Sequence, residues 1–150
     1  MKRSRLDMAL ASAAIAIAVS TLPAGTVARA DDRTPITLTA AERDHLLAGM
    51  RTYLSSLADI TESLSKYDPE TVTRAAKRSG AKMLIDIPPM VALKLPIEFT
   101  ALSLATHDQF DQLAARAEKH VARTELLSHV AAIMGHCNGC HAAYRLVVAP

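Results

Sequence analysis

Two long stretches of this sequence repeat apolar residues at alternating intervals of four and three, the spacing of one face of an α-helix. They comprise Leu46, Met50, Tyr53, Leu57, Ile60 and Leu64 in the first stretch, and Leu126, Val130, Ile133, Cys137, Cys140 and Tyr144 in the second. A helix with such a stripe owes most of its stability to burying the stripe against neighbouring elements. Glycine is scarce, with 5 residues in 150, and the alternation typical of strands is absent. The chain is therefore expected to form packed helices.

Capping signals place the starts of the first two helices. Thr39 and Glu42 form a capping box, in which each side chain accepts a hydrogen bond from a free backbone N–H group. Asp68 followed by Pro69 is typical of an N-cap with proline in the first turn, so a second, short helix is expected from there to Gly80.

Two further helices are expected in the second half of the chain. The third runs from about residue 97 to residue 120 and buries Phe99, Leu102, Thr106, Phe110, Leu113 and Ala117. The fourth starts near Thr124 and extends to Tyr144. Residues 81–96 carry three prolines and are expected to form a connecting loop on the core surface. Because short connections favour antiparallel neighbours, the predicted fold is all-α, an antiparallel up-down four-helix bundle.

Residues 1–30 have the pattern of a cleaved signal peptide. MKRSR is a positive start, residues 8–19 are apolar, and Ala28-Arg29-Ala30 has the small-x-small form that signal peptidases accept. The apolar run is too short to span a bilayer comfortably, so no membrane span is expected after cleavage. We expect residues 31–150 to form a single domain, exported to a bacterial periplasm.

Charge and composition exclude some classes of function. The whole sequence has a net charge of +2, but residues 1–30 hold four basic side chains and one acidic side chain. The mature chain would therefore have 13 basic and 14 acidic side chains, a net charge of −1. Without a basic stripe, a nucleic-acid partner is not expected. No catalytic combination of nucleophile and base or of paired carboxylates can be assembled, so we do not expect an enzyme.

Both cysteines lie in Cys137-Asn138-Gly139-Cys140-His141, the covalent attachment signature of c-type haem. Residues three apart share one face of a helix, so both thiols can reach the two vinyl groups along one edge of a porphyrin. The next residue then supplies an imidazole as the proximal iron ligand. The motif predicts one haem c, held by Cys137 and Cys140, with His141 on the iron.

Other interpretations of the two cysteines have less support. A structural zinc site needs four ligands, and no second pair of cysteines or histidines is suitably spaced. A thioredoxin-like redox pair needs an α/β pattern around it. A disulfide across two residues of a helix would close a small, strained loop, although it remains the usual state of exported cysteines.

The C-terminal segment CNGCHAAYR resembles the CxxCHxxYR ending of the class II cytochromes c, the cytochrome c′ group. The segments RDHLLAGMRTYL and LPIEFTALSLATHDQFDQLA also look like parts of its members, and the resemblance covers residues 39–147. It implies a four-helix bundle with the haem on the last helix and Arg145 near the haem propionates. It further implies a homodimer that forms through the first two helices.

The second axial ligand is expected to come from an earlier helix, because AAYRLVVAP after His141 contains neither methionine nor histidine. In the low-spin branch of the resembled group a methionine of the first helix binds the iron, and Met50 on the first stripe is the candidate. The alternative is that Met50 fills the core and Leu47 covers an open iron, as in five-coordinate cytochromes c′.

Other methionines and histidines are weaker ligand candidates. Met134, His129 and His136 share the helix of His141 and cannot easily reach the opposite face of a haem. The others are Met83 and Met90 on the proline-rich loop, His45 and His107, and the helix-terminal His120. His107, beside Asp108, is expected at the surface or in a polar contact.

The sequence thus predicts a periplasmic electron carrier with His141 and Met50 as axial ligands and a protein as its redox partner. The alternative is a five-coordinate protein that binds small gases such as nitric oxide or carbon monoxide. A third reading is a haem-free disulfide protein with an interaction role.

Overall fold

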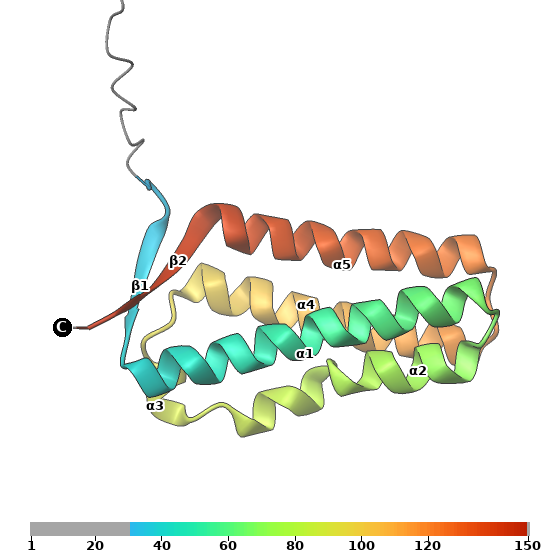
Figure 1. Ribbon diagram of the computed structural model, residues 1–150, viewed down its shortest axis with the longest axis horizontal. Helices are drawn as coiled ribbons and strands as arrows, with labels where there is room; N and C mark the ends of the chain where they lie inside the picture. Colours follow the sequence, from blue (N-terminus) through green and yellow to red (C-terminus); the bar gives the residue numbers. More distant parts are fainter. Residues whose placement is uncertain (1–30, 150) are drawn as a thin grey trace, which may run out of the picture. The chain divides into compact units, whose positions relative to one another are not determined.

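The computed structural model describes residues 31–149, and the predicted signal peptide at residues 1–30 lies outside the described residues (Figure 1). The elements are β1 (Thr34–Leu38), α1 (Ala40–Ser65), α2 (Pro69–Arg78), the 3₁₀ helix η1 (Ala81–Asp86), α3 (Pro89–Ala92), α4 (Ile97–Glu118), α5 (Arg123–Ala143) and β2 (Tyr144–Val148). The described residues from Asp32 onward form one compact unit. The prediction that the chain is mainly helical is confirmed, and the structure adds a small two-stranded sheet.

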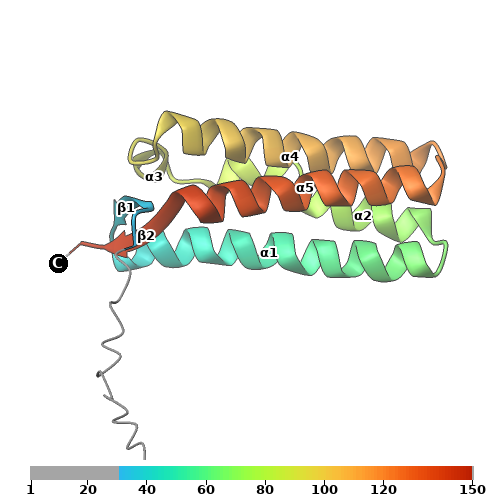
Figure 2. The same ribbon diagram turned by 90° about the horizontal axis from the view of Figure 1, so that it is seen from above.

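Four of the helices, α1, α2, α4 and α5, lie lengthwise beside one another (Figures 1 and 2). α2 packs against both α1 and α4, and α4 packs along α5. α1 and α5, in contrast, barely touch. The helices therefore leave one side open, between α1 and α5.

The helix starts follow the capping signals. The Thr39 hydroxyl accepts from the Glu42 N–H at 3.2 Å, and a Glu42 carboxylate oxygen accepts from the Thr39 N–H at 2.8 Å. Asp68 accepts from the Thr71 N–H at 3.0 Å, with Pro69 in the first turn of α2. Each interaction satisfies a backbone donor that the first turn of a helix leaves without a partner.

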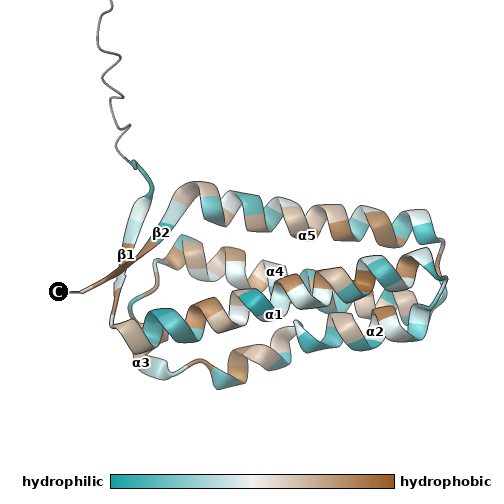
Figure 3. Ribbon diagram, in the orientation of Figure 1, coloured by the Kyte–Doolittle hydropathy of each residue, from teal (hydrophilic) through white to brown (hydrophobic). Residues whose placement is uncertain are grey.

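The main core joins all four long helices and includes five of the twelve stripe residues, with Tyr53, Leu57 and Cys137 packed against it. Its buried members are Ile60, Leu64, Val72, Ala75, Ala76, Phe110, Leu113, Ala114, Ala117, Leu126, Val130 and Ile133. On the predicted buried face of α4, five of the six residues are buried and Leu102 is half-buried. Figure 3 shows hydrophobic and hydrophilic residues mixed along each helix, as expected of helices with one buried face.

The prediction that the fourth helix includes Tyr144 is wrong, because α5 ends at Ala143 and the chain continues as a strand. β2 pairs in parallel with β1, with Thr34 opposite Tyr144 and Leu38 opposite Val148. Burial of Ile36 and Leu38 against Phe99 accounts for the pairing. The last residues therefore close one end of the helical unit.

The segment 81–96, expected as a loop, contains the two short helices η1 and α3. Pro89 stands in the first turn of α3, where the missing N–H of proline costs nothing. Only Val91 of this segment is buried, so α3 is anchored to the rest by a single apolar side chain.

None of the helices within residues 31–149 is both long enough and apolar enough to cross a membrane.

Two glycines give a matched test of the packing. A Cβ atom at Gly80 would lie 1.9 Å from a carboxylate oxygen of Asp111, which accepts a hydrogen bond from the Ala81 N–H. A Cβ atom at Gly135, on the exposed side of α5, would meet nothing within 4 Å. We expect Gly80→Ala to lower the free energy of unfolding by ~1–3 kcal/mol, and Gly135→Ala to raise it by ~0.5–1 kcal/mol. Urea unfolding measures both, and a Gly80→Ala protein as stable as the parent would contradict the packing.

Candidate functional site

An apolar cavity of about 450 Å³ lies in the opening between α1 and α5. Its walls contain Leu47, Met50, Arg51, Tyr53, Leu54 and Leu57 of α1, Phe99, Ser103 and Thr106 of α4, and Met134, His136, Cys137, Asn138, Cys140 and His141 of α5. The volume falls within the ~300–1,000 Å³ range of small-molecule and cofactor sites. The cavity brings together the Cys137, Cys140 and His141 motif with Met50.

The two cysteines are held on the cavity face of α5. Both are free thiols and half-buried, and they stand one turn apart on the same side of the helix. Burial raises the pKa of the Cys137 thiol and that of the Cys140 thiol, so both carry their protons at neutral pH. His141, the next residue, is exposed at the same wall of the cavity.

The end of α5 that carries this motif is fixed by the strands. An Arg33 guanidinium nitrogen donates to the His141 carbonyl oxygen at 3.2 Å, and Arg145 Nε donates to the Arg33 carbonyl oxygen at 3.3 Å. The rings of Phe99 and Tyr144 meet edge to face, with centroids 5.4 Å apart. The β1–β2 pair therefore ties the backbone of His141 to the N-terminal strand and to α4.

On the opposite wall, α1 presents both residues that the sequence nominates for the second axial position. Met50 and Leu47 are half-buried and line the cavity together. They are three residues apart, so they share one face of the helix.

Three arginines surround an adjoining cavity of about 310 Å³. Arg145, predicted from the resemblance, lies there with Arg33 and Arg43, and this cavity shares Cys140 and His141 with the first one. Arg33 and Arg43 were missed at the sequence level. Arg43 stands four and seven residues before Leu47 and Met50, so its helical spacing could have revealed it. Arg33 reaches the site through strand pairing, which no local signal predicts.

His107 is engaged in other contacts. It is buried, 1% exposed, so the expectation of a surface position is wrong and that of a polar contact is confirmed. Its Nδ1 lies 2.8 Å from the Ser79 carbonyl oxygen, and its Nε2 lies 2.7 Å from the Tyr53 hydroxyl. A carbonyl can only accept, so Nδ1 donates, and in the neutral ring Nε2 accepts from Tyr53. Neither ring nitrogen is left to bind a metal.

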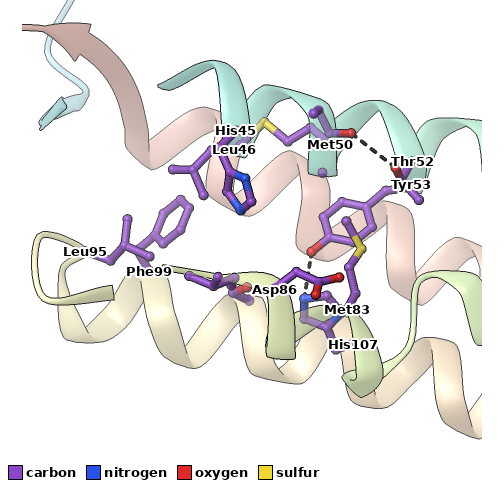
Figure 4. Close-up of a pocket in the computed structure, with 14 residues that line it drawn as sticks. His45, Leu46, Met50, Thr52, Tyr53, Met83, Asp86, Leu95, Phe99 and His107 are labelled. Atoms are coloured by element: carbon purple, nitrogen blue, oxygen red, sulfur yellow. Dashed lines mark hydrogen bonds between the residues drawn. The ribbon is translucent and has the colours of Figure 1, made fainter. Parts of the chain in front are cut away.

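Of the remaining ligand candidates, only residues of α5 itself line the cavity of the cysteine motif. His45 and Met83 line a different cavity of about 260 Å³, beside α1 and η1 (Figure 4). Met90 is exposed on α3 and lines neither cavity. His136 and Met134 line the large cavity, but they belong to the same helix as His141. His120 is exposed just after the end of α4.

Within residues 31–149, no three histidine, cysteine or acidic side chains lie close enough together to hold a metal ion among themselves. The zinc interpretation of the two cysteines gains no support from this part of the chain. An apolar cavity flanked by two thiols and an imidazole, with arginines at one end, is instead chemically suited to a flat, largely apolar group with carboxylates at one edge.

Comparison with protein-family models, with curated proteins and with solved structures gave no match to this chain.

The burial of Tyr53 predicts an effect of pH on stability. Burial raises the pKa of Tyr53 to about 12, which means that the folded state favours the neutral phenol. This contribution to stability is fully present below about pH 10, the ordinary pKa of tyrosine, and is lost as the pH rises towards 12. We expect an absorbance titration of tyrosinate to show a component near pH 12 that is absent from Tyr53→Phe.

The same substitution should destabilise the protein at neutral pH. Tyr53→Phe leaves the buried His107 Nε2 without a donor, which costs ~1–3 kcal/mol. Tyr67→Phe is the control, because Tyr67 is exposed and its ring is retained. Equal free energies of unfolding for the two variants in urea would contradict the assigned hydrogen bond.

Proposed function

We propose that this protein is a periplasmic c-type cytochrome that transfers single electrons through one covalently attached haem. In this proposal α1, α2, α4 and α5 are the four helices of a class II cytochrome bundle, and the haem is carried on α5. The contacts of α2 with α1 and α4, and of α4 with α5, support a bundle of this kind.

The observation that carries the proposal is the composition of one cavity. Cys137, Cys140 and His141 line the same apolar cavity as Met50. Met50 belongs to α1 and precedes Cys137 by 87 residues in the sequence. The two thiols would hold the porphyrin by thioether bonds, and His141 of α5 and Met50 of α1 would supply the ligands of the iron. When bound, the haem supplies a one-electron couple between Fe(II) and Fe(III).

The other residues of the site have supporting roles in this proposal. Leu57 and Phe99, which are half-buried and buried, would exclude water and so lower the local polarity around the redox centre. Arg43 and Arg145 would offset the charge of two propionate carboxylates at one end. The hydrogen bonds from Arg33 and Arg145 hold the His141 backbone in place, so this residue would be kept in position to bind the iron.

The wider predictions about the protein belong to the same proposal. The signal-like residues 1–30 support export to the periplasm, where the partner would be another redox protein. A homodimer through α1 and α2 is implied by the resemblance to class II cytochromes c. The role is that of an electron carrier and not of an enzyme.

The absorption spectrum of the exported protein, produced together with the cytochrome c maturation machinery, tests this function. We expect a Soret band that stays with the polypeptide after acid–acetone extraction, because thioether bonds survive this treatment. A colourless protein, or haem that extracts completely, would show that no covalent attachment takes place.

Substitution of the α1 residues tests the axial ligand. We expect the parent protein to be low-spin, with a weak sulfur-to-iron charge-transfer band, and Met50→Ala to be high-spin and to bind carbon monoxide. Leu47→Ala is the matched control, because it removes a neighbouring cavity side chain and leaves the thioether. A Met50→Ala protein that stays low-spin would show that another residue binds the iron.

One observation favours a second candidate function. Leu47 and Met50 both line the large cavity and the adjoining arginine cavity, so Leu47 is placed at the site as well as Met50 is. If Leu47 covers the distal face, the iron is five-coordinate and the protein binds small gases such as nitric oxide or carbon monoxide. A high-spin parent spectrum that shifts with carbon monoxide would establish this alternative.

A further inference from the structure

We propose that the open mouth of the large cavity is the docking face for a protein redox partner with an acidic surface. This inference rests on the proposed electron-transfer function and adds the chemistry of the partner. We define the docking face as Arg51, Leu54 and Met134 at the large cavity, with Arg33, Arg43 and Arg145 at the adjoining one.

The charged side chains that line these two cavities are all arginines. Four arginines contribute, and neither lining contains an aspartate or a glutamate. In the proposed holoprotein Arg43 and Arg145 would also face the haem propionates, so Arg51 is the cation on which the docking face chiefly relies. Arg43 is partly offset by Asp44, with 2.8 Å between nitrogen and oxygen. Arg51 is exposed and forms no ion pair with the described residues, so its charge faces solvent at the mouth.

This local charge contrasts with the charge of the rest of the chain. Residues 31–150 have 13 basic and 14 acidic side chains, and four of the basic ones are these arginines. The other 9 basic and 14 acidic side chains sum to a net charge of −5. Such asymmetry orients a charged partner during diffusional encounter, even when the whole protein has a small net charge of the same sign as the partner.

The mouth also has an apolar centre. Leu54 of α1 is 70% exposed and Met134 of α5 is 52% exposed, and both line the large cavity from opposite helices. Interface cores are enriched in methionine and arginine and depleted in lysine and acidic residues. A small apolar centre with a cationic margin suits a transient complex, in which charge guides the approach and brief apolar contact completes it.

A protein fits this face better than a lipid surface does. The apolar side chains lie at the opening of a concave cavity, whereas binding to a bilayer requires an apolar face that can enter the headgroup layer. We therefore expect no sedimentation with phosphatidylglycerol vesicles. If the parent protein sediments with these vesicles and Arg51→Glu does not, the face binds a membrane and the proposal is overturned.

The reaction of the reduced holoprotein with hexacyanoferrate(III) measures the local charge. One electron passes from the protein to the anion, which becomes hexacyanoferrate(II). We expect the second-order rate constant to fall at least about threefold between ~10 mM and ~500 mM salt, because screening removes the attraction to the arginines. A rate constant that rises with salt would mean that the overall negative charge governs encounter, and this would overturn the proposal.

A pair of charge reversals separates the local effect from the overall charge. Arg51→Glu and Arg74→Glu change the net charge equally, but Arg74 is an exposed residue of α2 that lines neither cavity of the docking face. At low salt we expect Arg51→Glu to lower the rate constant at least about threefold and Arg74→Glu by less than about 1.5-fold. Equal effects of the two variants would overturn the proposal.

Titration with poly-L-glutamate provides a readout that does not depend on electron transfer. In NMR spectra of the purified protein we expect salt-sensitive shifts at Arg51, Leu54 and Met134 and none at Arg74. If the protein carries no haem, the proposed function fails while this titration still tests the docking face. Shifts spread evenly over the protein, or no shifts, would overturn the docking face alone.

Discussion

The separation of α1 from α5 is the constraint on which the site depends. α2 packs on α1 and α4, and α4 packs on α5, so the helices hold one another without closing the gap between the first and the last. The gap is lined mainly by apolar side chains. Apolar surface left in water is unfavourable by ~25 cal/mol per Å², so an open apolar cleft of this size favours a bound apolar group. The two cysteines of the chain lie at its wall, where they would attach such a group.

A small set of buried polar contacts fixes the wall formed by α1. The Tyr53 hydroxyl bonds to His107 of α4, and the Ser79 hydroxyl donates to the Ser56 hydroxyl of α1 at 2.9 Å. His107 also bonds to the Ser79 carbonyl oxygen, so the residue after α2 joins α1 to α4. Buried polar groups with all partners present favour one arrangement of the helices over others of similar apolar content. Met50 and Leu47 therefore face the cavity from a helix whose rotation is defined.

The sequence was sufficient for the features that depend on local chemistry. The capping box at Thr39 and the cap at Asp68 predicted where α1 and α2 begin, and the stripes predicted the parts of the core that α1 and α5 contribute. It was not sufficient for β1 and β2, because their pairing joins residues 110 positions apart, such as Thr34 and Tyr144. One-turn helices such as α3 are too short to show a periodicity.

For the site, spacing predicted that the cysteines and His141 share one wall, and the α1 stripe predicted that Met50 faces them. Spacing cannot choose between Met50 and Leu47, since both lie on one face of α1. For His107 the sequence left two alternatives, a surface position and a polar contact. The surface position was considered because the neighbouring Asp108 makes the segment look polar, and it is wrong.

The intact mass of the exported protein is the measurement that bears most directly on this account. The protein produced with the cytochrome c maturation machinery should exceed the mass of its mature polypeptide by the mass of one haem, and the variant with Cys137→Ser and Cys140→Ser should not. A parent protein with the mass of the polypeptide alone would contradict the account, because the thiols at the cleft would then attach nothing.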